Sequence, residues 1–264
     1  MSKITLSFLI LMGLLFTACV PTKDIIYLQK KDMKDEGMFI SQVESNPYRV
    51  QPNDILNISI KAIDPKLVAM FNIAEVAGGG ARTETGGYFD GYNVDDHGNI
   101  RVPVLGEVNV LGLTADEIRV KLESLLLASY FYKEADIFVT VKLSGFRYTI
   151  IGEIGNSGSN VLYRDKVSVL EAIANAGDIT ITGDRKNIVI IRKLLHGTEM
   201  HSIDLTDSNV MQSPYYYLQP NDFVYIKPIK QKTWGTGTTG LQSLTTIIST
   251  LTLLFTTYFI FKSL

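Results

Sequence analysis

The side chains best suited to chemistry in this chain are three histidines, one cysteine and small clusters of hydroxyl, carboxylate and glycine residues. The histidines, His97, His196 and His201, lack the spacing of metal ligands, and His97 lies in a predicted turn. Histidines in such settings are mostly structural or solvated. We therefore predict no metal site and no catalytic histidine.

Other patterns that could hold a reactive group have simpler interpretations. Ser157 in GNSGS lacks the spacing of a nucleophile elbow, and Asp95-Asp96 lacks the later ligands of a calcium loop. The run Gly78–Gly80 is not followed by the Lys-Ser or Lys-Thr of a phosphate loop. Tyr215–Tyr217 could stack on sugar rings, but an aromatic-rich strand is the plainer interpretation. The sequence predicts a protein that is not an enzyme and uses no cofactor.

Cys19 has a different context, because it follows a predicted export signal. Lys3, an apolar run over 6–16 and two small residues precede it, and this layout is typical of a signal peptide over residues 1–18. The pattern resembles the lipobox of bacterial lipoproteins, in which the cysteine thiol is acylated, although Phe16 stands where Leu is usual. We expect Cys19 to be the lipid attachment site. An incidental thiol in an uncleaved anchor is the alternative.

The C-terminal segment resembles a second anchor. Residues 241–261, LQSLTTIISTLTLLFTTYFIF, carry no charge and would span about 32 Å as a helix, which matches the thickness of the hydrocarbon layer. We expect a transmembrane helix over residues 241–262. The residues 235–240, GTGTTG, read as a flexible joint, and we assign a linker to 231–240.

This segment is two-sided when it is drawn as a helix. One face is apolar, and the opposite face carries the pore-lining candidates Gln242, Thr245, Ser249, Thr252 and Thr256. A polar face of this kind suits water or hydroxyl partners. However, Ser and Thr can also bond to carbonyls of their own helix, and helix packing favours them too. The sequence leaves these two interpretations open.

The elements between the anchors are predicted from local patterns. Residues 23–46 are polar and rich in Lys and Asp, which indicates a tether. The turn Gln-Pro-Asn-Asp occurs twice, at 51–54 and 219–222, each time before an alternating strand, so we expect a recurring structural corner. Capping boxes at Thr114 with Glu117 and at Ser168 with Glu171 each begin a predicted helix that a strand follows. Two successive α+β units are the simplest account.

These residues resemble a known family. The stretch YRVQPNDILNISI, taken with GYNVDDHGNIRVPVLGEVNVLGLTADEIRVKLESLLLASYFYKEADIFVTVKL, is similar to the export domain of bacterial outer-membrane polysaccharide export lipoproteins. Residues 146–229 look like one soluble-ligand-binding β-grasp unit. The resemblance implies an acylated N-terminus and tether over 19–46, a polysaccharide export domain over 47–144 and a β-grasp domain over 145–230. The Gly-rich insertion at 74–92 has no counterpart that we can align.

The resemblance also implies a function and partners. Members of this family are lipid-anchored in the outer membrane, with soluble domains in the periplasm, and assemble into homo-oligomeric rings, for example octamers. Their C-terminal helices surround a passive aqueous pore for capsular polysaccharide or exopolysaccharide, and an inner-membrane chain-length-regulating polysaccharide co-polymerase is the partner. The net charge of −2 gives no reason to expect nucleic-acid binding.

Two other functions remain open at this point. A lipid-anchored periplasmic module that binds a glycan or peptide would use the C-terminal helix only as an anchor. An envelope hydrolase would need one of the three histidines for turnover. Placement of the C-terminal helix in an inner membrane is also compatible with the sequence, because Lys262 alone says little about orientation.

Overall fold

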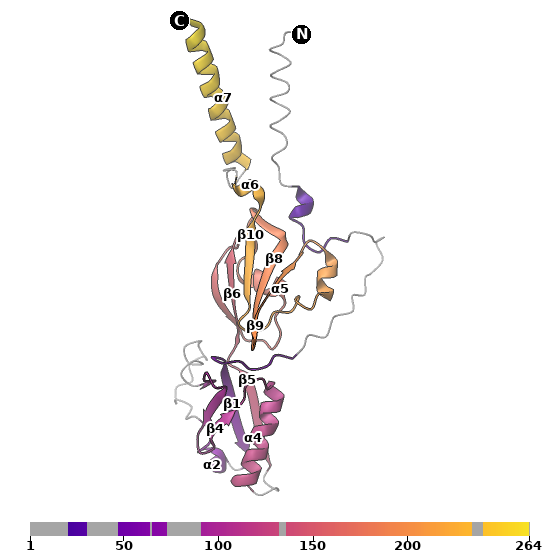
Figure 1. The fold of residues 1–264 in the computed structure, drawn as a ribbon, viewed down its shortest axis with the longest axis vertical. Coiled ribbons are helices and arrows are strands. Elements are labelled where there is room, and N and C mark those ends of the chain that lie inside the picture. The colour runs from indigo at the N-terminus through magenta and orange to yellow at the C-terminus, as the bar shows by residue number, and fades with distance from the viewer. Residues whose placement is uncertain are drawn as a thin grey trace.

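A computed structural model describes residues 21–30, 47–63, 65–72, 91–131, 136–233 and 240–263. The predicted signal peptide, Cys19, Gly78–Gly80 and most of the Gly-rich insertion lie outside the described residues. Figure 1 shows an elongated arrangement, with a first domain at one end, a second domain in the middle and a long C-terminal helix at the other end. The mixture of helices and sheets confirms the predicted α+β class.

The first domain is built around a small antiparallel sheet. The strands β1 (Ile55–Ala62), β2 (Tyr92–Asn93) and β5 (Ile137–Leu143) lie in the order β2-β1-β5, beside the hairpin of β3 (Asn99–Val102) and β4 (Gly106–Asn109). The predicted alternation along β1 is confirmed, because Leu56, Ile58 and Ile60 are buried. The short helix α2 (Pro65–Val68) lies against β1.

Helix α4 (Ala115–Ser129) covers this sheet and begins where the capping box predicts. The Thr114 hydroxyl accepts from the Glu117 amide at 3.2 Å, and the Glu117 carboxylate accepts from the Thr114 amide at 2.8 Å. On its inner face, Ile118, Leu122 and Leu126 are fully buried, and Leu125 packs partly buried against the same core.

The second domain has a five-stranded sheet with its own hydrophobic core. Its strands are β6 (Phe146–Gly152), β7 (Gly158–Leu162), β8 (Gly183–Leu194), β9 (Gly197–Ile203) and β10 (Phe223–Pro228), in the order β7-β6-β10-β8-β9. All pairs are antiparallel except β10 with β6, which is parallel. Helix α5 (Val169–Asn175) and the 3-10 helix η3 (Ser208–Gln212) contribute to the core on one side of this sheet.

The ends of α5 follow from its sequence. The predicted capping box is formed by Ser168 and Glu171, and Gly177 follows the helix with a φ of 82°. A positive φ is easily adopted by glycine, which explains why the chain leaves the helix at this residue. Arg164 donates to the Glu171 carboxylate at 2.7 Å and reinforces this corner.

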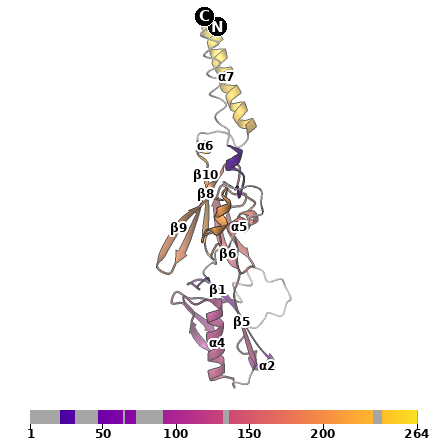
Figure 2. The ribbon, with the colours of Figure 1, turned by 90° about the vertical axis from the view of Figure 1, so that its right-hand side faces the viewer.

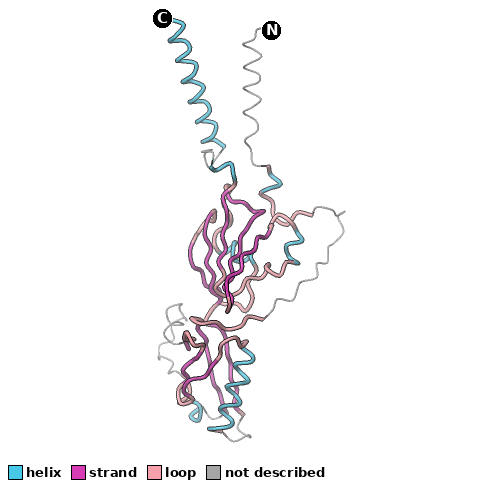
Figure 3. Tube along the Cα trace, viewed as in Figure 1, coloured by secondary structure: helices cyan, strands magenta, loops and turns pink. Residues whose placement is uncertain are grey.

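Residues 21–30 form a strap on the second domain, whereas the sequence predicted a free tether from residue 23. The 3-10 helix η2 (Thr22–Asp24) opens the strap, and the Leu28 and Gln29 amides donate to the Leu205 and Thr206 carbonyls at 3.0 and 2.7 Å. Tyr27 and Leu28 pack on the core of this domain. Polar composition predicted the tether, but the strap is held by backbone bonds that composition does not reveal. In Figure 3 it lies along the upper part of the second domain.

The chain ends in helix α6 (Lys230–Thr233) and helix α7 (Gly240–Ser263), which extends away from the second domain in both views of the ribbon (Figures 1 and 2). The helical conformation predicted here is confirmed. The predicted transmembrane assignment for residues 241–262 is not supported, because no helix among the described residues is long and apolar enough to cross a membrane. Thr and Ser hydroxyls interrupt the apolar stretch of α7.

Candidate functional site

The two copies of the Gln-Pro-Asn-Asp turn have the same backbone conformation. Asn53 and Asn221 have φ values of 71° and 67°, in the left-handed region that asparagine tolerates better than most residues. In each copy the following aspartate side chain accepts the amide of the turn's first residue, Gln51 in one and Gln219 in the other, at 2.8 and 2.7 Å. The predicted recurring corner is therefore confirmed.

The partners of the two aspartates differ. Asp54 accepts three neutral donors, namely the Gln51 amide, the Tyr48 hydroxyl at 2.7 Å and the Asn221 side-chain amide. Asp222 is paired with Arg192, whose Nη2 lies 2.8 Å from the carboxylate and whose Nε lies 3.1 Å away. Tyr216, which occupies the position of Tyr48 before the second turn, packs instead against the core of the second domain. Arg192 therefore takes the place of a tyrosine as the partner of the second aspartate.

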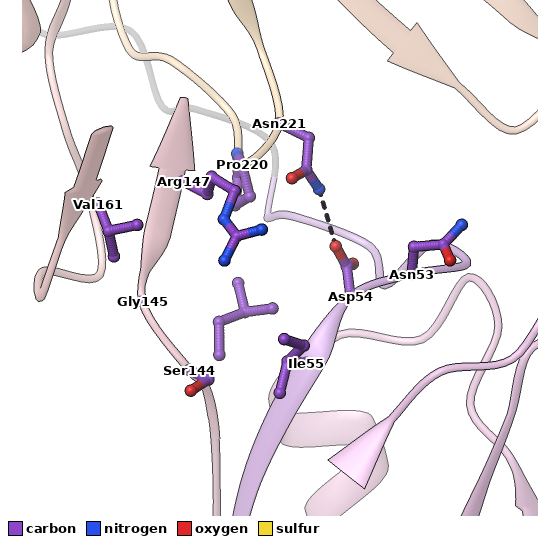
Figure 4. A pocket seen from close by; sticks show the side chains of 10 residues that line it. Asn53, Asp54, Ile55, Ser144, Gly145, Arg147, Val161, Pro220 and Asn221 are labelled. Carbon is purple, nitrogen blue, oxygen red and sulfur yellow. Dashed lines mark hydrogen bonds between the residues drawn. The ribbon is translucent and has the colours of Figure 1, made fainter. Parts of the chain in front are cut away.

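The two corners meet at the junction between the domains. The Asn221 side-chain amide donates to the Asp54 carboxylate at 2.8 Å (Figure 4). A second bond runs from the Gln51 side chain to the Lys193 carbonyl at 3.1 Å. The turn that precedes β1 in the first domain is thereby joined to the turn that precedes β10 in the second domain.

Burial shapes the electrostatics of this junction. It raises the pKa of the Asp54 carboxyl above its usual 3.8, while the bonds from Gln51, Tyr48 and Asn221 oppose the rise. Burial also raises the pKa of Asp222, against the pull of Arg192. The pKa of Tyr48 is raised by burial and by the Asp54 charge. The negative charge of Asp54 therefore costs free energy in the folded state. Protonation of this carboxyl can change the strength of the contact between the domains.

A small polar hollow lies beside the junction, as Figure 4 shows. Its volume is about 40 Å³, which holds a few water molecules and excludes a sugar ring. Its wall is formed by Asn53, Asp54, Ile55, Leu143, Ser144, Gly145, Arg147, Val161, Pro220 and Asn221. The junction is suited to fixing two domains and does not offer a binding site for a glycan.

The residues considered for catalysis do not come together. His97 lies in the turn held by Asp95, whose carboxylate accepts the His97 amide at 2.8 Å, and His196 lies in the exposed β8–β9 turn. His201 stacks on Tyr215 with ring centroids 3.6 Å apart. Ser157 is exposed in the loop before β7. Within the described parts of the chain, no group of His, Cys, Asp and Glu side chains could hold a metal ion.

The hydroxyl face predicted for the C-terminal segment lies on α7. The hydroxyls of Ser249, Thr252 and Thr256 donate to the carbonyls of Thr245, Ile248 and Thr252 at 2.7 to 2.8 Å. Each hydroxyl therefore satisfies its donor within the helix and keeps its oxygen as an acceptor toward the surroundings. Gln242 belongs to α7, but its side chain lies outside the described residues.

A second hydroxyl stripe runs beside the predicted one. Thr250 and Thr257 donate to the Thr246 and Leu253 carbonyls at 2.8 Å. At 100° per residue, Thr246, Thr250 and Thr257 lie next to the first face. The sequence analysis missed this stripe, although the spacing of the threonines could have revealed it.

The first domain is similar to a known protein family. Residues 42–142 match the family described as "Polysaccharide biosynthesis/export protein". The chain is 27% identical over 186 residues to the EPS I polysaccharide export outer membrane protein EpsA of Ralstonia solanacearum. The match covers 65% of this chain and 46% of that protein, so the chain spans about half the length of this relative. The predicted resemblance to polysaccharide export proteins is confirmed.

Proposed function

We propose that this chain, a member of the polysaccharide export family through residues 42–142, is a ring-forming outer-membrane lipoprotein that passes capsular polysaccharide or exopolysaccharide out of the cell. The family match and the name of the Ralstonia relative support export and the outer membrane. The α7 helices of the copies pack side by side, hydroxyl stripes inward, around a passive aqueous passage. In this proposal residues 47–144 are the export domain and residues 145–230 the β-grasp domain.

The arrangement of the two chain ends is the single observation that carries the proposal. The strap ties η2 to the end of the second domain from which α6 and α7 leave (Figures 1 and 2). Cys19 precedes Pro21 by two residues, a reach of at most about 7 Å of chain. An acyl group on Cys19 would therefore enter the membrane at the end that carries α7. The acyl group and α7 then lie at the same end of the molecule.

The contacts of the strap explain how this end is fixed. The Tyr27 hydroxyl donates to Asp178 at 2.5 Å, and the Arg185 guanidinium lies 5.2 Å from the centroid of the Tyr27 ring. Lys186 forms an ion pair with Asp24. The strap is thus fixed to the second domain, and the first domain lies at the far end of the molecule (Figure 1). That end would face the inner-membrane co-polymerase.

The chemistry of α7 suits a passage for sugars. Hydroxyls whose donors are satisfied by their own helix can still accept hydrogen bonds from a hydrated chain, and the exchange with water gives little net gain. A polysaccharide can then slide without being held. Because each of these hydroxyls donates to a carbonyl of its own helix, its hydrogen needs no acceptor on the polysaccharide.

Gene deletion with complementation tests the proposal. Loss of the chain should abolish surface polysaccharide and leave polymer behind in the cell, and the complete chain should restore export. Replacing α7 with an unrelated apolar helix of equal length should not restore it. Restoration by that replacement would favour the alternative, a lipid-anchored binding module whose helix is only an anchor.

A further inference from the structure

One loop of the second domain contacts both the N-terminal strap and the segment that leads into the C-terminal helix. Residues 178–182, which we call the shared loop, connect α5 to β8. The strap bonds to the first residue of this loop, and the chain between β10 and α6 bonds to the last. In Figure 1 the strap and α6 lie at the same end of the second domain, and α7 follows α6.

The strap holds the shared loop through Tyr27. The Tyr27 hydroxyl donates to the Asp178 carboxylate at 2.5 Å, and the same carboxylate accepts the Ile179 amide at 2.6 Å. Asp178 has a φ of 66°, in the left-handed region that is strained for a residue with a side chain. The bond from Tyr27 therefore stabilises a loop conformation that the backbone alone disfavours.

Arg185 extends the influence of Tyr27 along the loop. Its guanidinium lies 5.2 Å from the centroid of the Tyr27 ring and donates to the Ile179 and Thr180 carbonyls at 2.8 and 3.2 Å. Arg185 is 4% exposed, and its Nε has no acceptor among the described residues. Loss of the Tyr27 ring would admit water, which competes with the two carbonyls for the guanidinium. Tyr27 therefore protects the bonds that position the middle of the loop.

Glu153 connects the other side of the shared loop to α6. One oxygen of its carboxylate accepts the Thr180 and Thr182 hydroxyls at 3.1 and 2.6 Å. The other oxygen forms an ion pair with Lys232 of α6. The backbone adds a direct bond, because the Ile229 amide donates to the Thr182 carbonyl at 2.9 Å. The position of the shared loop therefore sets the position of α6.

Close packing lets a shift at one end of the loop reach the other. A Cβ added at Gly183, the residue after the loop, would lie 2.3 Å from Cγ2 of Ile179 and 3.0 Å from the Glu153 carbonyl oxygen. The Thr180 amide donates to the same carbonyl at 3.1 Å. Because the loop packs this tightly on Glu153, a movement of Asp178 is passed to the residue that holds α6.

The strap is itself bound in a strained conformation. Leu28 has a φ of 53°, which a leucine adopts only when its surroundings impose it. The surroundings here are the Leu205 and Thr206 carbonyls, which accept the Leu28 and Gln29 amides. Loss of a few contacts would relieve this strain, so the strap has a bound and a released arrangement.

We infer that the shared loop couples the strap to α6, so that release of the strap loosens the base of α7. Coupling of this kind is reciprocal, and loss of the α6 contacts should also loosen the strap. The device belongs to a single chain. It goes beyond the proposed function and requires neither a ring nor a passage.

Hydrogen exchange of backbone amides in the full-length, detergent-extracted protein tests the coupling. Tyr27→Ala should speed exchange of the Leu28 and Gln29 amides, which reports release of the strap. It should also raise the exchange rate of the Ile229 amide about fivefold or more. Asn221→Gly is the matched control, because it removes a contact at the opposite end of the second domain, and it should leave the Ile229 amide unchanged. Unchanged exchange of the β8 amides would show that both variants fold.

A double-variant cycle tests whether the two attachments share the loop. Glu153→Ala removes the carboxylate that binds Lys232 and both threonine hydroxyls, so it should speed exchange of the Ile229 amide and of the Leu28 amide. In combination with Tyr27→Ala, its effect on the Ile229 amide should be several-fold smaller than in the unsubstituted protein, because the loop has already lost its position.

Two results would overturn the inference. The first is an Ile229 amide that exchanges at its normal rate in Tyr27→Ala while the Leu28 amide exchanges fast, since the strap would then leave without loosening α6. The second is that the effects of Tyr27→Ala and Glu153→Ala multiply, as independent attachments require. Both measurements report on contacts within one chain, so absence of the proposed ring would leave their outcome unchanged.

Discussion

The Asn221 side-chain nitrogen lies 2.8 Å from a carboxylate oxygen of Asp54, 167 residues away in the sequence, so two copies of one turn motif are joined at the domain junction. Asn221 holds a left-handed φ and uses its side chain to reach the other copy. Asn53 shares the backbone conformation and lines the hollow, but among the described residues its side chain forms no hydrogen bond to the second domain. Substitutions at the two asparagines therefore distinguish the contribution of the turn conformation from that of the hydrogen bond between the domains.

We predict that Asn221→Gly weakens the junction while Asn53→Gly does not. Glycine keeps the positive φ at both sites, so the difference between them reports the bond to Asp54. Loss of a hydrogen bond to a charged group should lower the free energy of unfolding by about 1.5–3 kcal/mol for Asn221→Gly. Urea denaturation measures it, and Asn53→Gly should stay within about 0.5 kcal/mol of the unsubstituted protein. Equal losses in the two variants would contradict the role of the contact.

We predict that stability depends on pH through Asp54. Its folded pKa is raised above 3.8 by burial, so the folded state binds the proton more tightly than the unfolded state. The contribution of Asp54 is then fully present below about pH 4 and is lost as pH rises through the folded pKa. In urea titrations, the stability of the unsubstituted protein relative to Asp54→Asn should fall as pH rises above about pH 4. A constant or rising difference would refute this.

We predict that Arg192→Met is among the most damaging single substitutions in the second domain. Asp222 is 1% exposed, and without Arg192 its charge would be buried with one fewer partner. Breaking a buried pair from one side costs about 3–5 kcal/mol, measured by thermal or urea unfolding. The double variant Arg192→Met with Asp222→Asn should recover part of this loss. No recovery would show that Arg192 matters for packing and not for the charge.

We predict that Tyr27 controls whether the strap stays bound. Tyr27→Phe removes only the hydroxyl that donates to Asp178, whereas Tyr27→Ala also uncovers Arg185 and exposes the core beneath the ring. Limited proteolysis after residue 30 should be slightly faster in Tyr27→Phe and much faster in Tyr27→Ala. If both variants are cut at the rate of the unsubstituted protein, the strap does not depend on this side chain.

The features that sequence reasoning predicted correctly are local. Both capping boxes, the alternation along β1 and β10 and the recurring turns at 51–54 and 219–222 depend on residues within a few positions of each other. The features that it missed join distant segments. The strap is held by carbonyls of residues 205 and 206, and Arg192 replaces a tyrosine as the partner of the second corner. Neither can be read from spacing, because the partners are set by the tertiary fold.

The pore-lining candidates show the same limit. The periodicity placed Thr245, Ser249, Thr252 and Thr256 on one helical face, and the helix is confirmed. The bonds from the hydroxyls to their own carbonyls were one of two interpretations that the sequence left open. What the hydroxyl oxygens face depends on neighbouring copies, which a single chain does not specify.

Cysteine accessibility along α7 in intact assemblies tests the central claim most directly. Single cysteines at Thr245, Ser249, Thr252 and Thr256 should react with a membrane-impermeant, water-borne maleimide, and cysteines at Ile248, Leu251 and Phe255 should not. Labelling of Thr252→Cys should also block export in cells, because the bulky adduct narrows the passage. If the hydroxyl positions resist the reagent while the assembly is intact, α7 does not line an aqueous passage and the proposed export pore is wrong.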